Sequence, residues 1–470
     1  MQVIVILGIA LTLGLMQAAG SIPAGPWLIP LLGLYLVGTA LLRAWDTSLG
    51  LNMLRAKDQP SKARFGLAAV VSGIAKAWLV LGSAATVGLG LGDVLDRAGG
   101  PMTWPLVDKL LALSPLIAAL LIYWLLEYPL HRAVRLKLSQ RETRAGRNPG
   151  RIWSLGQYLV FNIRHQLLFI LVPVSLILLT TDLLEAHLLP ALGFTGHAAS
   201  LTVAATLAAA LLVFLLIPVL LVRIWKTAPL PPGPTRQQLE DMCSQMQLRY
   251  RRLLVWKSEG VLANAGVMGL IAPVRYILMS DGLLENMAPE QIRAIFAHEA
   301  GHVKHHHILH AMVFAIATVM LADVLSVHLM DRWNWPVWLA AAAAMVTLLV
   351  VWAVGFGWLS RRFERQADVI AAWSGGPGLD QRPDPDRITA EGSAAFASAL
   401  EEVARLNYIQ RDRFNWRHGP IGWRVAHVLH LGATGGTRTG IDRLVRWIQL
   451  GLWLLLGLAV GLTAITYAGL

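Results

Sequence analysis

The sequence predicts a polytopic α-helical membrane protein that carries a small α+β unit outside the bilayer. Hydrophobic residues make up 56% of the 470 positions and charged residues only 14%. Ordinary globular domains contain about a quarter charged residues, so this composition departs from that of a soluble chain. The mean hydropathy is +0.55, and the 18 tryptophans suit a protein with many side chains at the headgroup boundary.

About nine apolar stretches approach the roughly 20 residues that a membrane-crossing helix needs. They lie at roughly residues 2–20, 27–44, 68–91, 104–126, 158–181, 199–222, 308–328, 336–359 and 447–468. The first has no basic segment before it, so we expect a retained span and not a signal peptide. Lys76, Asp108 and Lys109 intrude on two stretches. Either these charges face a protein interior, or the two spans begin later than drawn.

The charges of the loops set the expected orientation. Segments 43–65 and 131–151 are rich in Lys and Arg, whereas 92–103 and 182–198 are mainly acidic. Basic loops remain on the cytoplasmic face of a membrane. Counting the crossings onward places the two long polar stretches, 223–307 and 360–446, on that same face.

The formal net charge of +12 does not indicate a nucleic-acid partner. The basic residues are concentrated in a few loops between apolar runs, and no basic–aromatic module is visible. The single Cys243 excludes an internal disulfide bond and a cysteine-rich metal site.

The expected organisation has five parts. An amino-terminal membrane region (1–226) precedes a polar segment (227–307), a membrane hairpin (308–359), a second polar segment (360–446) and a last span (447–470). Inside the polar segments we expect a helix at 236–247, a β-hairpin formed by 264–270 and 275–284, and a helix that begins after Ala288-Pro289-Glu290. Helices are also expected at 360–373 and 389–407, with irregular chain at 374–386 between them.

The most informative motif is the sequence HEAGH at 298–302. On a helix, His298 and His302 project from one face about 6 Å apart along the axis, which suits two ligands of one zinc ion. Glu299 lies beside them and is placed to take a proton from water activated by the metal. The alternative is a polar helix with two paired histidines. The motif favours a zincin-like catalytic unit that binds one zinc ion per chain.

A catalytic zinc ion needs a third protein ligand and one open position. His306 lies about 12 Å along a straight helix from His298 and therefore cannot be that ligand. The metzincin pattern is also absent, because His305 and Ile308 occupy its glycine and third-histidine positions. We expect the remaining histidines to form either a solvated cluster near the membrane surface or a weak second metal site; they are His305, His306, His307 and His310.

The better third ligand is Glu364, because the membrane hairpin returns the chain to the same face just before it. Asp368 follows one helical turn later. We expect Glu364 to bind the metal and Asp368 to orient one of the imidazoles, since ligating histidines usually donate their second N–H to a carboxylate or carbonyl. The alternative is an ordinary salt-bridged turn with neighbouring arginines, which are Arg361, Arg362 and Arg365.

Four sequence blocks extend this interpretation. They are NAGVMGL with RYILMSDGLL, AHEAGHVKHH, SRRFERQAD and WRHGPIGWRV, spread in this order over about residues 235–430. In them the chain resembles the membrane zinc metalloproteases of the gluzincin type that include the CAAX prenyl proteases and the bacterial heat-shock membrane protease. The last block reads His418-Gly419-Pro420 where His-Pro-Ser is commoner.

The resemblance implies roles for four further residues. Asn264 and Ala265 would lie on an edge strand that pairs with the substrate backbone. His418 and Arg424 would stand near the reacting carbonyl and stabilise its developing charge. The alternative for His418 is a surface position in a basic stretch.

Together these features predict a membrane-embedded, zinc-dependent endopeptidase that cleaves membrane-associated, prenylated or misfolded proteins. Its partners would be a protein or peptide substrate and membrane lipid, and its location a bacterial inner membrane with the site on the cytoplasmic side. Two alternatives stay open, a zinc-binding membrane sensor without turnover and a metal transporter. The choice of substrate, any dependence on a prenyl group and the oligomeric state do not follow from the sequence.

Overall fold

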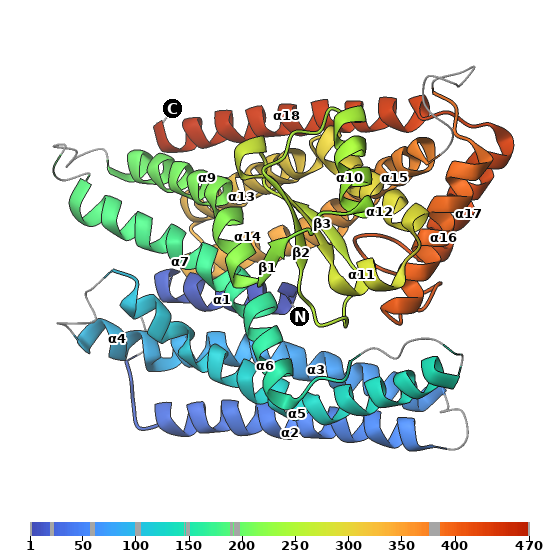
Figure 1. The fold of residues 1–470 in the computed structure, drawn as a ribbon. Coiled ribbons are helices and arrows are strands. Elements are labelled where there is room, and N and C mark those ends of the chain that lie inside the picture. The colour runs from blue at the N-terminus through green and yellow to red at the C-terminus, as the bar shows by residue number, and fades with distance from the viewer. Residues whose placement is uncertain are drawn as a thin grey trace. The chain divides into compact units, whose positions relative to one another are not determined.

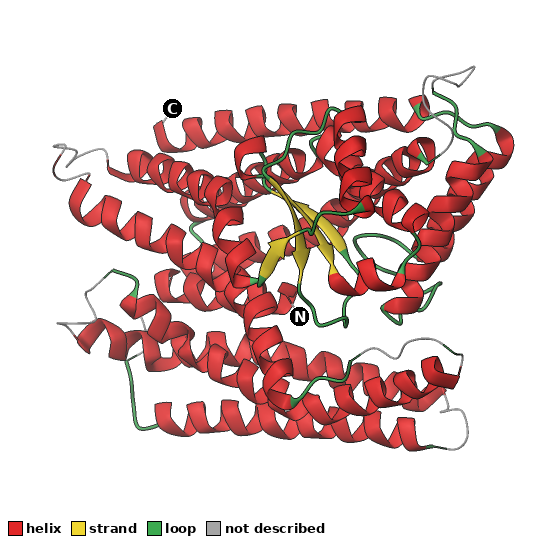
Figure 2. Cartoon of the chain, in the orientation of Figure 1, coloured by secondary structure: helices red, strands yellow, loops and turns green. Residues whose placement is uncertain are grey.

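A computed structural model describes residues 2–18, 23–56, 62–98, 105–144, 146, 151–188, 191, 198–375 and 386–468. The chain forms two compact units, Met1–Phe214 and Leu215–Leu470, and the boundary falls inside helix α9 (Ala198–Ile224). Helices dominate, and the strands of one small sheet lie together in the second unit (Figure 2).

The first unit is a bundle of apolar helices: α1 (Gln2–Ala18), α2 (Leu28–Arg55), α3 (Lys62–Thr86), α4 (Gly92–Ala98), α5 (Val107–Arg144), α6 (Leu155–Asn162), α7 (Leu168–Leu183) and the first part of α9. Helix α2 packs against α3 and α5, and α1 packs against the same two helices. Inside the bundle, buried Arg43 forms ion pairs with Asp46 and with Glu127, the latter at 2.8 Å. Charges in a membrane are normally paired in this way.

The charges that interrupted two predicted spans have different positions. Helix α5 begins at Val107, so Asp108 and Lys109 lie in its first turn, and Lys109 Nζ lies 2.9 Å from Asp182 Oδ2. The helix therefore begins later than the predicted stretch at 104–126. Lys76 lies within α3 and is half-buried.

The described helices support a multi-pass membrane fold. Seven are long and apolar enough to cross a bilayer: Leu28–Arg55, Ala63–Leu95, Val107–Arg144, Leu155–Leu183, His307–Trp333, Leu339–Ser374 and Thr439–Tyr467. Two shorter apolar helices, Ile4–Gly14 and Ala208–Ile224, fall at the first and sixth predicted spans. The seven long helices fall at the other seven, so the predicted positions of about nine apolar segments agree with the fold.

The second unit contains a four-stranded sheet with the order β1-β2-β4-β3. Its strands are β1 (Thr227–Pro229), β2 (Arg252–Trp256), β3 (Ala265–Met268) and β4 (Tyr276–Ser280). The predicted hairpin is confirmed, because β3 and β4 pair antiparallel with Ala265 opposite Met279. Gly269 follows β3 with φ +105°, and a Cβ at this position would lie 2.2 Å from the carbonyl oxygen of Val274. The turn therefore needs glycine.

The other half of the sheet, strands β1 and β2, is not among the predicted elements. Strand β2 pairs parallel with β4 and antiparallel with β1. A parallel pairing joins strands that are distant in the chain, so it leaves no local turn signal. The four side chains of β4 that precede Ser280 are buried hydrophobic groups, so β4 lies in the core of the sheet and β3 at its edge.

Nine described α-helices of the second unit follow β1 in the chain (Figure 1). They are α10 (Pro234–Gln245), α11 (Asp281–Asn286), α12 (Pro289–Lys304), α13 (His307–Trp333), α14 (Val337–Val351), α15 (Gly357–Ser374), α16 (Ala390–Leu406), α17 (Ile421–Thr434) and α18 (Thr439–Ala468). The helices predicted at 236–247, after Ala288, at 360–373 and at 389–407 correspond to α10, α12, α15 and α16. Of the predicted irregular stretch, 376–385 lie outside the described residues.

Helix α12 is the element that positions the site. It begins at Pro289, which suits the first turn because that turn leaves its N–H groups without intrahelical acceptors. Its apolar face buries Phe296, Ala297 and Ala300 in the core of the unit. The helix contacts β3, α15 and α16, so its polar side chains face the elements that carry the other site residues.

Candidate metal centre

The two histidines of the HEAGH motif converge on one point. Nε2 of His298 and Nε2 of His302 lie 3.2 Å apart on adjacent turns of α12. Glu364 on α15 faces the pair, with Oε2 3.5 Å from His298 Nε2 and Oε1 3.6 Å from His302 Nε2. One donor atom from each of the three side chains lies within 4.8 Å of the others. The spacing is that of three ligands around one cation.

Close packing of two helices brings the carboxylate to the histidines. Helices α13 and α14 separate α12 from α15 in the chain, and α15 then packs along α12. At the contact, a Cβ added to Gly301 would lie 3.2 Å from Ala367 Cα. Glycine therefore permits the short separation, and Glu364, only 6% exposed, lies between α15 and the imidazoles.

The donor set fits a zinc ion. Two imidazole nitrogens and one carboxylate leave a fourth position open, which is typical of catalytic zinc sites. Among the described residues, Glu364 Oε2 is a buried atom that lies 3.3 Å from Arg424 Nη2 and 3.5 Å from His298 Nε2 but forms no hydrogen bond. A buried carboxylate oxygen without a hydrogen bond is costly, and a cation between Glu364 and the imidazoles would compensate for it.

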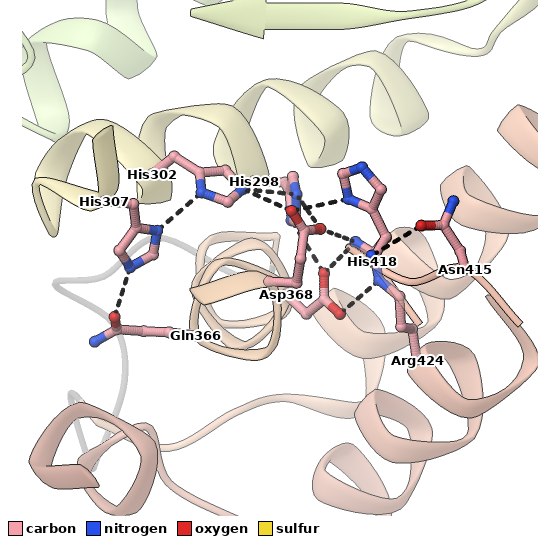
Figure 3. Close-up of polar contacts among 9 residues, drawn as sticks. His298, His302, His307, Gln366, Asp368, Asn415, His418 and Arg424 are labelled. Carbon is pink, nitrogen blue, oxygen red and sulfur yellow. Dashed lines mark hydrogen bonds and ion pairs between the residues drawn. The ribbon is translucent and has the colours of Figure 1, made fainter. Parts of the chain in front are cut away.

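The other nitrogen of His298 faces a second carboxylate. Asp368 Oδ1 lies 3.0 Å from His298 Nδ1, so the two histidine nitrogens point toward Asp368 and Glu364. Asp368 also accepts two hydrogen bonds from Arg424 on α17, at 2.9 Å and 2.6 Å. Nη2 of the same guanidinium lies 3.3 Å from Glu364 Oε2. Arg424 thus compensates the charge of two buried carboxylates, and Figure 3 shows its side chain directed at Asp368.

His418 reaches the cluster from the loop before α17. Its Nδ1 lies 2.9 Å from Glu364 Oε1, and its side chain is 41% exposed. The backbone N–H of His418 donates to Asn415 Oδ1 at 3.1 Å (Figure 3). Gly419 has φ +76°, a conformation that proline cannot adopt. The departure from the commoner His-Pro-Ser sequence is therefore matched by a left-handed turn here, and Pro420 precedes α17 instead.

The site shifts the proton affinities of its groups in opposite directions. Burial lowers the pKa of His302 to about 4. Burial also disfavours the charged form of His298, but the interactions with the carboxylates of Asp368 and Glu364 outweigh burial and raise the pKa of His298 to about 10. For Glu299, burial raises the pKa to about 7, although the charge of His298 and a hydrogen bond from the backbone of Val267 act against it. Glu299 thus titrates near neutrality, as a general base should.

Strand β3 ends the sheet next to α12, as an edge strand that accepts a peptide would. The backbone of Asn264 is paired on one side only among the described residues: its N–H donates to Ser280 Oγ, and its carbonyl accepts from Ser280 N, both at 2.9 Å. Ala265 pairs with Met279 on that same side. The other edge of β3 is unpaired in the described sheet, and Val267 of this strand contacts Glu299.

Of the two alternatives for the remaining histidines, a solvated cluster does not hold for His307 and His310. His307 is 3% exposed and His310 7% exposed, so these two are not solvated; only His306 is exposed. The chain does not continue as one straight helix, because α12 ends at Lys304 and His306 adopts a left-handed conformation with φ +54° before α13 begins. This break turns His307 back toward His302, and their Nδ1 atoms lie 2.8 Å apart. His307 and its partner Gln366 are residues of the site that the sequence reading missed.

Comparisons with known proteins find similarity in sequence and in fold. Residues 231–380 match the sequence profile of the family described as Peptidase family M48. The fold is similar to that of the crystal structure of S. mikatae Ste24p, with a TM-score of 0.53 over 86% of this chain and 99% of that chain. The sequence identity is 16%, so this similarity concerns the fold. A comparison with curated proteins gives no match.

Proposed function

We propose, from the premise that this chain is a membrane metallopeptidase of family M48, that it is a zinc-dependent endopeptidase with the metal held by His298, His302 and Glu364. The observation that carries the proposal is the convergence of these three donors, with atoms within 4.8 Å of one another, beside Glu299. The donor set has the composition of a catalytic zinc site and leaves a position for the reacting groups.

Glu299 is the general base of the proposed reaction. A zinc ion in this set would act as a Lewis acid that acidifies water and polarises the substrate carbonyl. The Glu299 carboxylate takes the proton of the attacking water and then donates it to the leaving amine. A pKa near 7 lets one group do both, because its protonated and deprotonated forms are both well populated at neutral pH.

The residues around the base stabilise and align the reaction. Exposed His418 offers an N–H to the developing negative charge on the carbonyl oxygen. Asp368 orients His298 through Nδ1 at 3.0 Å, as a carboxylate behind a ligating imidazole does. Arg424 holds Asp368 and Glu364 and adds positive charge near the reacting carbonyl.

Strand β3 supplies the proposed substrate cradle. An extended peptide added to its free edge would gain main-chain hydrogen bonds from the Asn264 and Ala265 region without demanding particular side chains. This edge lies beside α12, so a peptide bound there would pass close to Glu299.

The catalytic unit is formed by two segments, 227–307 and 360–446, that flank the membrane hairpin 308–359. The loop charges favour the cytoplasmic side of a bacterial inner membrane for both. Substrates reachable from that position are membrane-associated proteins, including prenylated or misfolded ones.

A single substitution tests the mechanism. Glu299→Gln should keep zinc bound at one ion per chain, because the amide leaves the three ligands intact, but should abolish cleavage of casein or a peptide by the detergent-solubilised protein. Zinc content is measured by elemental analysis and cleavage by release of fluorescent peptides. Undiminished cleavage by Glu299→Gln would contradict the proposed base, and a wild-type protein that binds zinc without cleaving would indicate a sensor.

A further inference from the structure

A chain of hydrogen bonds begins at the second ring nitrogen of His302. While Nε2 of His302 faces Glu364, its Nδ1 lies 2.8 Å from Nδ1 of His307. The Nε2 of His307 lies 2.9 Å from Oε1 of Gln366 on α15. Figure 3 shows the three side chains in a row leading away from His298.

The middle of this chain is shielded from water. Gln366 is 1% exposed and His307 3%. The ring of His307 stacks on Phe363, with the centroids 4.3 Å apart and the planes within 6° of parallel. Neither side chain can replace its partner by solvent, so a broken bond would leave a buried polar atom unsatisfied.

The direction of each hydrogen bond follows from the groups involved. An amide oxygen only accepts, so His307 donates from Nε2 to Gln366. A neutral imidazole has a single N–H, which leaves Nδ1 of His307 as an acceptor. His302 must then donate from its own Nδ1 and present a bare Nε2 toward Glu364. A bare Nε2 is the form in which an imidazole binds a metal ion.

The far end of this series of hydrogen bonds lies on another helix, α18. Nε2 of Gln366 donates to Asp442 Oδ1 at 2.6 Å and contacts His305 Nδ1 at 3.0 Å. Asp442 lies in the first turn of α18, which is a candidate membrane span. Gln366 therefore accepts from His307 and donates to Asp442 at once. The amide of Gln366 combines these two capacities, whereas an ionised glutamate has no donor and leucine has neither group.

We propose that His307 and Gln366 are positioning residues that hold His302 in its metal-binding tautomer, and that Asp442 anchors them to α18. The proposal deepens the proposed function and rests on it. The two ligating histidines would then be oriented differently. The charged Asp368 orients His298, and the uncharged side chains of His307 and Gln366 orient His302. Zinc affinity would depend on the docking of α18, a membrane helix that itself supplies no ligand.

The first test is the zinc affinity of the full-length protein in detergent, measured by competition with a chromophoric chelator. Gln366→Leu should bind zinc about 10- to 100-fold more weakly, the usual effect of removing a partner of a ligating histidine. The matched control is Gln291→Leu on α12. Gln291 bonds to Ser398 and to the backbone of Ala288, and it has no hydrogen bond to an imidazole among the described residues, so its loss should leave zinc affinity unchanged.

An exchange of groups separates positioning from general packing. Gln366→Glu keeps the acceptor for His307 but faces Asp442 with a second carboxylate, so it should weaken zinc binding. The double variant Gln366→Glu/Asp442→Asn restores a donor opposite an acceptor, and neutral His305 can adopt either tautomer beside it. It should recover most of the zinc affinity lost in the single variant. If the residues acted through packing alone, the losses of zinc affinity in Gln366→Glu and in Asp442→Asn would add in the double variant.

The outcomes distinguish this proposal from the proposed function. A wild-type zinc affinity in Gln366→Leu would contradict the positioning role of His307 and Gln366. So would a double variant whose loss of zinc affinity equals the sum of the losses of its two single variants. The exchange keeps the volume of both side chains, so it decides the question even where Gln366→Leu does not fold. Either result leaves the ligand set and Glu299 standing, whereas a wild-type protein without bound zinc would contradict the proposed function itself.

Discussion

Gly301 and Ala367 lie so close that a Cβ on the glycine would be 3.2 Å from the alanine Cα. This contact joins α12, which carries both histidines, to α15, which carries Glu364 and Asp368. The distance between the two helices sets the distance between the imidazoles and the carboxylate. The packing of two small residues is therefore a condition for the metal site.

The first prediction concerns this contact. Gly301→Val should push α15 away from α12, because an overpacked interior shifts backbone or strains rotamers at a cost of about 1–3 kcal/mol. We expect a lower melting temperature and weaker zinc binding. Gly440→Ala is the control, since a Cβ at this position in α18 meets nothing within 4 Å. Unchanged zinc affinity in Gly301→Val would show that the helix separation does not limit the site.

The second prediction concerns the third ligand. Glu364→Ala should lower the zinc content of the purified protein well below one ion per chain, since only two imidazoles remain. Glu240→Ala is the matched control, because Glu240 is a half-exposed carboxylate of the same unit that pairs with Arg236 and should not affect zinc. Elemental analysis after dialysis measures both. A zinc content equal to that of the wild type would remove Glu364 from the ligand set.

The sequence predicted the parts of the fold that depend on local patterns. The apolar runs identify the spans, the HEAGH motif identifies α12, and alternation with turn residues identifies the hairpin of β3 and β4. Strand β2 was not predicted, because its parallel pairing with β4 is a long-range contact without a local sequence signal.

The candidate site shows the same division. The spacing of His298 and His302 on a helix follows from its period, and the return of Glu364 follows from the membrane hairpin. The position of His307 does not, because it depends on a single left-handed residue, His306, between two helices. A left-handed non-glycine residue is uncommon, and no residue type in the stretch HVKHHH marks it.

The third prediction concerns Arg424. Its guanidinium contacts the carboxylates of Asp368 and Glu364. Arg424→Met should leave two buried carboxylates without their counter-charge, which costs about 3–5 kcal/mol when one partner of a buried ion pair is removed. Added zinc should restore part of this loss, because the cation supplies positive charge to Glu364.

The measurement for Arg424→Met is the melting temperature with zinc and with a chelator. The difference between these two temperatures should be larger in the variant than in the wild type. Arg236→Met, which breaks a half-exposed pair with Glu240, should leave it unchanged because exposed pairs contribute about 0–1 kcal/mol. An equal difference in Arg424→Met and the wild type would contradict a charge-compensating role.

The fourth prediction concerns Cys243, the only cysteine of the sequence. Its side chain lies in the core of the second unit, and burial raises the pKa of the thiol to about 12. The reactive thiolate is therefore nearly absent at pH 8. We expect no labelling by a maleimide in the folded protein and full labelling after denaturation. Rapid labelling of the native protein would show that this core opens readily.

The fifth prediction concerns the pH dependence of zinc binding. Without metal, the interactions with the carboxylates of Asp368 and Glu364 outweigh burial and keep the pKa of His298 near 10, so His298 is protonated at neutral pH. The pKa of His302 is near 4, so His302 is already neutral. A metal ion binds only the neutral imidazole, and binding must therefore release one proton from His298.

Zinc affinity should rise about tenfold for each pH unit between pH 6 and 9, because the proton competes less as the pH approaches the pKa of His298. Chelator competition at several pH values measures the slope. Asp368→Asn removes a carboxylate that stabilises the protonated ring, so the slope should flatten in this variant. A wild-type affinity that is independent of pH in this range would mean that His298 is neutral before the metal arrives, and that Asp368 orients the ring without charging it.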